Sequence, residues 1–168
     1  MSTPDWTVFK RKIYINAPIS DVYKAWATSE GLKDWFLEDA AYLDNGTEID
    51  SIQLAKVGHE YRFDWYHWES IGKGEVLEAN DQDHFAFSFE DMRVDIELKE
   101  EKGMTLCTLT QTGIPTDEES KFFKFHGCST GWTFFMANLK AMLEHGVNLI
   151  DKEEGLYGKH DGMEYVNN

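Results

Sequence analysis

The sequence predicts a single α+β domain in which a mostly antiparallel sheet packs against a long C-terminal helix. Three observations support this prediction. Apolar residues recur with helical spacing over residues 129–146, and apolar and polar residues alternate over most of residues 61–111. Two short helical segments follow a first strand near the N-terminus. The chain has 168 residues, enough for one domain with a sizeable core, so one domain over residues 1–168 is expected.

The first strand and the two short helices are predicted before residue 37. Residues 6–16 alternate loosely and are interpreted as a strand. Ala17-Pro18 ends it, because proline lacks the N–H that a strand ladder needs but is well placed to open a helix. A first helix follows, and Thr28-Ser29 caps a second one. The apolar faces of these two helices hold Val22, Tyr23, Trp26, Leu32, Trp35 and Phe36.

The middle of the chain predicts consecutive antiparallel strands. Asn45-Gly46 between two apolar runs is a hairpin signal. Short turns separate the strands expected after it, which cover residues 61–67, 72–79, 85–89, 94–99 and 104–111. With the first strand, a sheet of about six or seven strands is expected.

A capping box marks the start of the C-terminal helical region. Thr116 is the expected cap and Glu119 its N3 partner, which opens a helix through Phe122 to Phe125. Gly127 is a candidate break before the long helix. The domain core is expected over about residues 6–146, followed by a tail over residues 147–168.

The long helix is predicted between Ser129 and Gly146. Its apolar residues follow the i, i+3, i+4, i+7 spacing of one helical face, made of Trp132, Phe135, Met136, Leu139, Met142 and Leu143. Gly146 follows the last apolar turn, where a left-handed glycine commonly ends a helix. Such a face packs into a protein core more often than it lines a ligand site, so its role depends on the surface that it packs against.

Charge and composition limit the classes of partner. The chain has 16 basic and 31 acidic residues, a net charge of −15, which disfavours nucleic acid and anionic membrane surfaces. No apolar run is long enough for membrane insertion, and the N-terminus lacks the apolar segment of a secretory signal. Two cysteines, Cys107 and Cys128, are too few for a disulfide scaffold, so a cytoplasmic protein with reduced thiols is expected.

The sequence predicts no catalytic residue, no metal and no cofactor. Among the six histidines, only His126-x-Cys128 resembles the spacing of metal ligands, and two ligands are fewer than a closed zinc site requires. Nucleophile-elbow, phosphate-loop and dinucleotide fingerprints are missing from the sequence. An enzyme is therefore the least favoured class.

Two polar residues stand out, because alternation places them on apolar strand faces. His67 follows Tyr61, Phe63 and Trp65, and Gln111 follows Cys107 and Leu109. Buried polar groups need hydrogen bonds. A ligand could supply them, and so could the other polar residue, a water or a strand end, so both interpretations stay open.

Four segments, in the same order, resemble the START-like or SRPBCC superfamily. They are residues 15–36 (INAPISDVYKAWATSEGLKDWF), 58–65 (GHEYRFDW), 109–115 (LTQTGIP) and 131–146 (GWTFFMANLKAMLEHG). Within it the sequence is most similar to the C-terminal domain of the heat-shock chaperone ATPase activator. The resemblance implies a helix-grip fold like that of the birch-pollen allergen. In that fold a bent antiparallel sheet wraps around the long C-terminal helix, with two short helices after the first strand.

The superfamily has no shared catalytic set, so the resemblance assigns no catalytic residue. The activator also has an N-terminal domain that engages the chaperone, and this chain has no room for one, which weakens transfer of the co-chaperone role. The resemblance implies instead an elongated, aromatic-lined cavity between sheet and helix. Residues expected to line it are Phe63, Trp65, His67, Phe87, Phe89, Val94, Ile96, Gln111, Trp132, Phe135, Met136 and Leu139.

The expected function is the non-catalytic binding of a small hydrophobic molecule, such as a lipid, in this cavity. The alternative is a protein-interaction module with a solid interior, related to chaperone ATPase activators or to stress response. An enzyme of the cyclase or hydrolase kind comes third. The expected partner is the small hydrophobic molecule, while a chaperone and a second copy of the chain stay open.

Overall fold

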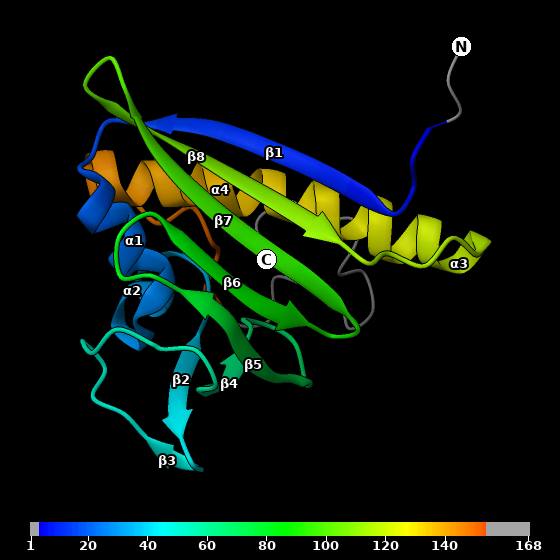
Figure 1. The fold of residues 1–168 in the computed structure, drawn as a ribbon, viewed down its shortest axis with the longest axis horizontal. Helices are drawn as coiled ribbons and strands as arrows, with labels where there is room; N and C mark the ends of the chain where they lie inside the picture. The colour runs from blue at the N-terminus through cyan, green and yellow to red at the C-terminus, as the bar shows by residue number, and fades with distance from the viewer. Residues whose placement is uncertain (1–3, 154–168) are drawn as a thin grey trace.

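The computed structural model describes residues 4–153 and shows an α+β helix-grip fold (Figure 1). The elements in chain order are β1 (Val8–Ile15), α1 (Ile19–Ala27), α2 (Ser29–Trp35), β2 (Asp39–Asp44), β3 (Thr47–Glu48), β4 (Glu60–Asp64), β5 (Ile71–Ala79), β6 (His84–Phe89), β7 (Met92–Glu101), β8 (Met104–Thr112), α3 (Glu118–Ser120), the π-helical segment η1 (Lys121–Gly127) and α4 (Cys128–His145).

One antiparallel sheet of eight strands forms the body of the domain, in the order β1-β8-β7-β6-β5-β4-β2-β3. The long helix α4 runs behind this sheet in Figure 1, and α1 and α2 lie at its C-terminal end. The predicted fold class is confirmed. The strand count exceeds the expected six or seven because β3, a two-residue strand, pairs with β2.

Three local signals in the sequence are confirmed. Thr28 caps α2, since its Oγ1 accepts a hydrogen bond from the Gly31 amide at 3.0 Å. Asn45 and Gly46 have φ values of 49° and 77°, the positive pair that a two-residue hairpin turn needs. Gly146 ends α4 with φ 66° and ψ 24°.

The predicted start and break of the C-terminal helical region are wrong. Asp117, not Thr116, is the cap, and its carboxylate accepts the Ser120 amide at 2.9 Å. Gly127 keeps helical angles of −59° and −56°, so α3, η1 and α4 form one continuous helical run. Glycine permits a break but does not force one. Here Phe125 of η1 packs edge-on against Trp6 at 4.9 Å and fixes this part of the run to the N-terminal segment.

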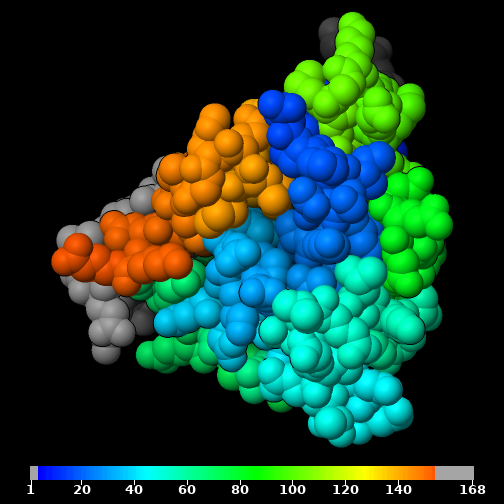
Figure 2. All heavy atoms as spheres, turned by 90° about the vertical axis from the view of Figure 1, so that its left-hand side faces the viewer, coloured from blue at the N-terminus to red at the C-terminus, as the bar shows by residue number. Residues whose placement is uncertain are grey.

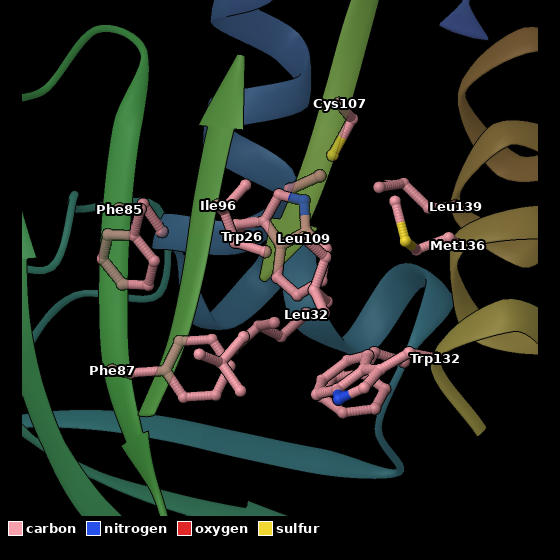
Figure 3. Packing of buried hydrophobic residues seen from close by; sticks show 14 of the residues in the cluster. Trp26, Leu32, Phe85, Phe87, Ile96, Cys107, Leu109, Trp132, Met136 and Leu139 are labelled. Carbon is pink, nitrogen blue, oxygen red and sulfur yellow. The ribbon is translucent and has the colours of Figure 1, made fainter. Parts of the chain in front are cut away.

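The core lies between the sheet and α4. In Figure 3 the side chains of Met136 and Leu139 point from α4 toward Cys107, Leu109 and Trp26. All five side chains are 3% exposed or less. This arrangement confirms that the apolar face of the long helix is core, as its periodicity indicates.

Candidate functional site

The predicted lining residues fall into three groups. Eight of them are 3% exposed or less, namely Phe63, Phe87, Val94, Ile96, Gln111, Trp132, Met136 and Leu139. Trp65, Phe89 and Phe135 are partly buried against this cluster. His67 alone is exposed. The structure thus brings eleven of the twelve together.

Aromatic rings fill much of the space between these residues. Phe36, at the end of α2, inserts between sheet and helix, with ring centroids 4.7 Å from Phe135 and 5.2 Å from Trp132. On its other side it meets Phe63 at 6.3 Å and Trp65 at 6.1 Å. Helical periodicity places Phe36 on the apolar face of a short helix but does not indicate this position.

A hollow of about 270 Å³ opens beside Trp65 and Phe89, and we call it the Trp65 pocket. Its walls come from β4, β5, the end of β6 and the loop between β4 and β5, and they are Tyr61, Trp65, Ser70, Ile71, Gly72, Lys73, Phe89 and Glu90. Trp65 and Phe89 are therefore the predicted lining residues that adjoin open space here.

Two glycines of β5 leave room for the aromatic rings of Trp65 and Tyr61, which line this pocket. Gly72 pairs with Phe63 and Gly74 with Tyr61 across the β4–β5 ladder. A Cβ at Gly72 would lie 2.6 Å from the Trp65 ring, and one at Gly74 would lie 2.6 Å from the Tyr61 ring. The indole of Trp65 thus occupies space that a side chain on β5 would otherwise fill.

The loop that carries Trp65 is held from outside by the C-terminal segment. His67 Nε2 lies 2.7 Å from the carbonyl oxygen of Asp151, and Lys152 Nζ lies 5.1 Å above the Tyr66 ring. The alternation that placed His67 on the inner face fails because β4 ends at Asp64, and His67 itself has a φ of 62°. It therefore faces outward, toward residues 151–152.

Gln111 is fully buried, and its hydrogen bonds are made within the protein. Its Oε1 accepts a hydrogen bond from Trp132 Nε1 at 2.8 Å. Its Nε2 donates to the sulfur of Met92 at 3.0 Å. A thioether is a weak acceptor, so the amide N–H groups are bound less strongly than they would be by oxygen. Burial raises the pKa of the Cys128 thiol, and Gln111 partly offsets this rise.

The buried Cys107 thiol and Tyr61 hydroxyl stay neutral near pH 7. Burial raises the pKa of the Cys107 thiol to about 12. Burial also raises the pKa of Tyr61 to about 12, and its hydroxyl donates to the Ser88 carbonyl at 2.6 Å. Among residues 4–153 no group of three or more His, Cys, Asp or Glu side chains is arranged to hold a metal ion. No helix in the same range is long and apolar enough to cross a membrane.

The outer face of the sheet carries a charged cluster on β5, β6 and β7. Arg93 donates to both carboxylate oxygens of Asp95, at 2.6 and 2.8 Å, and to Glu78 at 2.6 Å. His84 lies 3.2 Å from Glu78 and 3.3 Å from Asp95. Burial alone would raise the pKa of Asp95, but the Arg93 hydrogen bonds and charge outweigh it and lower the pKa.

This cluster predicts a pH-dependent stability. Because the pKa of Asp95 is lower in the folded state, its stabilisation is complete above the unfolded value of about 3.9 and is lost as pH falls through the folded value. Arg93→Met is expected to lower the thermal midpoint near neutral pH, by an amount that shrinks below about pH 3. Thermal melts across this range measure the difference. Lys99→Met is the control, because the exposed Lys99–Glu101 pair contributes little. An Arg93→Met deficit that stays constant into acid would contradict the assignment.

Comparison with known proteins gives a family and several similar folds. The family model described as Activator of Hsp90 ATPase homolog 1-like protein matches residues 16–144. The crystal structure of SSP2350 from Staphylococcus saprophyticus is 18% identical, with a TM-score of 0.68 over 84% of this chain and 94% of that one. The solution structure of the Aha1 dimer from Colwellia psychrerythraea is 18% identical, with a TM-score of 0.64 over 83% of this chain and 97% of that one.

A third similar structure is DynU16, from the dynemicin biosynthetic locus. It is 17% identical, with a TM-score of 0.66, and the match covers 85% of this chain but 49% of DynU16. No curated protein matches the sequence. At these identities the structural likenesses show a shared fold, while the family model covers most of the chain.

Proposed function

The chain belongs to the family of Activator of Hsp90 ATPase homolog 1-like proteins, and on this premise we propose that it binds a small apolar molecule at the Trp65 pocket. The single observation that carries the proposal is the place of the Trp65 indole. It lies over Gly72, on the inner face of β5, where the strand offers no side chain of its own. A ligand would enter by displacing this ring.

The walls of the pocket suit an apolar, flat molecule. The ring centroid of Trp65 lies 6.3 Å from that of Phe89 and 6.1 Å from that of Phe36, and both pairs are edge-to-face. Movement of the indole therefore exposes aromatic rings on two sides. The Tyr61 ring adds a third wall, and its hydroxyl is already satisfied by Ser88. The interior beyond these rings is apolar, so burial of an apolar ligand drives binding.

A ligand with one oxygen acceptor suits the site best. Phe89 pairs with Met92 across the β6–β7 hairpin, and its ring lies 5.7 Å from Trp132. Behind these residues the amide of Gln111 donates to the Met92 sulfur. Methionine is flexible and its thioether is a weak acceptor, so a ligand oxygen could take its place at Gln111.

Two tryptophans of the same loop provide the test. Trp65→Ala removes a ring that lines the pocket and covers Gly72, and Trp68→Ala removes an exposed ring that does not line it. We expect Trp65→Ala to bind the neutral probe N-phenyl-1-naphthylamine at least about tenfold more tightly than the wild type, because apolar space becomes free. Trp68→Ala is expected to match the wild type. Probe fluorescence measures the affinities, and circular dichroism checks that both variants fold. Equal affinities for the two variants would refute the proposal.

A second candidate function is a protein-interaction module of the chaperone-activator kind. The observation that favours it is a pair of exposed rings on η1, Phe122 and Phe123, which are 56% and 52% exposed. Two adjacent rings on one short segment are a weaker indication than a pocket lined by aromatic rings, so this role ranks below ligand binding. Several-fold stimulation of the ATP turnover of the cognate chaperone by this chain alone would reverse the order.

A further inference from the structure

A second hollow shares no lining residue with the Trp65 pocket. It measures about 430 Å³ and lies between α1, α2 and the C-terminal half of α4. We call it the helical groove. Figure 2 looks onto this side of the molecule, where the orange end of α4 meets the blue surfaces of α1 and α2.

The floor of the helical groove is apolar. Ala25 of α1 and Trp35 of α2 form one part of it, and Met142 and Leu143 of α4 form the other. On the rim, Ile52 is 69% exposed, which is a large exposure for an isoleucine. The floor and this rim residue together supply the apolar part of the groove lining.

The remaining rim is acidic. Asp21, Glu30 and Asp34 line the groove, against one basic residue, Lys24, and all four side chains are exposed. Among residues 4–153, none of the three carboxylates forms an ion pair with a basic side chain. Other acidic groups of the protein are neutralised locally, for example Asp95 by Arg93 and Glu144 by Lys140. The groove therefore presents unpaired negative charge around an apolar floor.

We propose that the helical groove binds a basic amphipathic helix of a partner protein. Apolar side chains at i, i+3 and i+4 of that helix pack on Ala25, Met142 and Leu143, as a third helix packs on two. Its lysine or arginine side chains face Glu30 and Asp34. The charge complementarity selects a basic partner over an acidic or neutral one and speeds the encounter.

The close packing of α1 against α2 explains why a glycine stands at position 31. Gly31 of α2 lies directly against α1, where a Cβ would come within 2.4 Å of the Lys24 carbonyl oxygen. A larger residue would separate α1 from α2 and change the shape of the groove. Gly31 thus sets the spacing of the two helices that carry Lys24, Ala25, Glu30 and Asp34.

The probe is a synthetic helix of about 18 residues with leucine on one face and lysine on the other, long enough to form a stable helix when bound. The comparison peptide has the same composition in an order without an apolar face. Binding is measured by calorimetry, and the site is located by the chemical-shift changes of backbone amides. We expect the amphipathic peptide to shift the signals of Thr28, Gly31, Met142 and Leu143, and the scrambled peptide to bind at least about tenfold more weakly.

Matched charge reversals distinguish binding at the groove from general electrostatic attraction to an acidic protein. Glu30→Lys with Asp34→Lys is expected to weaken binding of the amphipathic peptide by at least about tenfold. Glu97→Lys with Glu100→Lys, at two exposed positions of β7, makes the same change in net charge and is expected to weaken binding of the peptide by less than about twofold. Ile52→Asp is expected to weaken it without affecting the fold, since Ile52 is exposed.

Three outcomes would overturn the proposal. In one, the β7 reversals weaken binding as much as the groove reversals. In another, the amphipathic peptide shifts residues outside the groove. In the third, N-phenyl-1-naphthylamine, but not the peptide, shifts Thr28 and Leu143, which would make the groove a small-molecule site. None of these readouts depends on the Trp65 pocket.

Discussion

Gly31→Ala is expected to lower the free energy of unfolding by about 3 kcal/mol, at or above the upper end of ordinary overpacking. The added Cβ would lie 2.4 Å from the Lys24 carbonyl oxygen and 2.7 Å from the Ala25 Cα. Both neighbours are backbone atoms of α1, which cannot turn aside as a side chain can. The two helices must separate instead, and the buried Trp35 between them loses contacts.

Gly131→Ala is the matched control. Gly131 lies inside α4, and a Cβ there meets no atom within 4 Å. Alanine in an exposed helix position is more stable than glycine by roughly 1 kcal/mol, so this variant is expected to gain stability. Urea unfolding of both variants gives the two values. A Gly31→Ala protein as stable as the wild type would show that α1 and α2 are not tightly packed at this point.

Asn138→Leu is expected to lower the free energy of unfolding by about 2–4 kcal/mol, because it leaves buried polar groups unsatisfied. Asn138 is fully buried in α4. Its amide nitrogen donates to the Trp35 carbonyl at the end of α2 and to Asn148 Oδ1, and its Oδ1 accepts the Leu149 amide at 2.6 Å. One side chain thus joins α4, α2 and the segment after Gly146.

Ala137→Leu is the control for this prediction, since it places the same side chain on an exposed position of the same helix. It is expected to change stability by no more than about 0.5 kcal/mol. Hydrogen exchange adds a second readout, because the Leu149 amide loses its acceptor in Asn138→Leu and should exchange faster. Unchanged protection of Leu149 would mean that Asn138 does not hold this segment.

Local chemistry made much of the fold predictable. Thr28 and the Asn45-Gly46 pair act within a few residues of chain, so their effects are visible in the sequence. The strand alternation of residues 85–89 and 94–99 also reflects the two-residue repeat in the direction of side chains along a strand. The family resemblance supplied the way these elements assemble, and the match over residues 16–144 confirms the family.

Properties set by long-range packing were not predictable in this way. Asn138 lies off the apolar face of α4, and it is buried because the end of α2 and residues 148–149 pack against it. Phe36 follows a short helix, and nothing local shows that its ring enters the space between sheet and α4. Sequence periodicity describes which face of an element is apolar, but it does not measure how much of the enclosed volume other elements fill.

The sequence only weakly indicates the Trp65 pocket. Gly72 and Gly74 are two residues apart on one strand, so both face the interior, opposite Tyr61 and Phe63 on the neighbouring strand. Paired glycines facing aromatic residues indicate a place where rings approach the backbone closely. Single glycines scattered along the chain do not carry this meaning, and the pairing becomes visible only with the strand register.

The central claim is that an apolar molecule takes the place of the Trp65 indole, and proton contacts between a bound probe and the protein test it most directly. The measurement is a nuclear Overhauser spectrum of the wild-type protein with N-phenyl-1-naphthylamine. We expect contacts from the naphthyl protons to Gly72, Phe89 and the ring of Tyr61, together with a shifted Trp65 indole N–H signal. Contacts to Met142 and Leu143 instead, or a Trp65 signal that does not move at saturating probe, would contradict it.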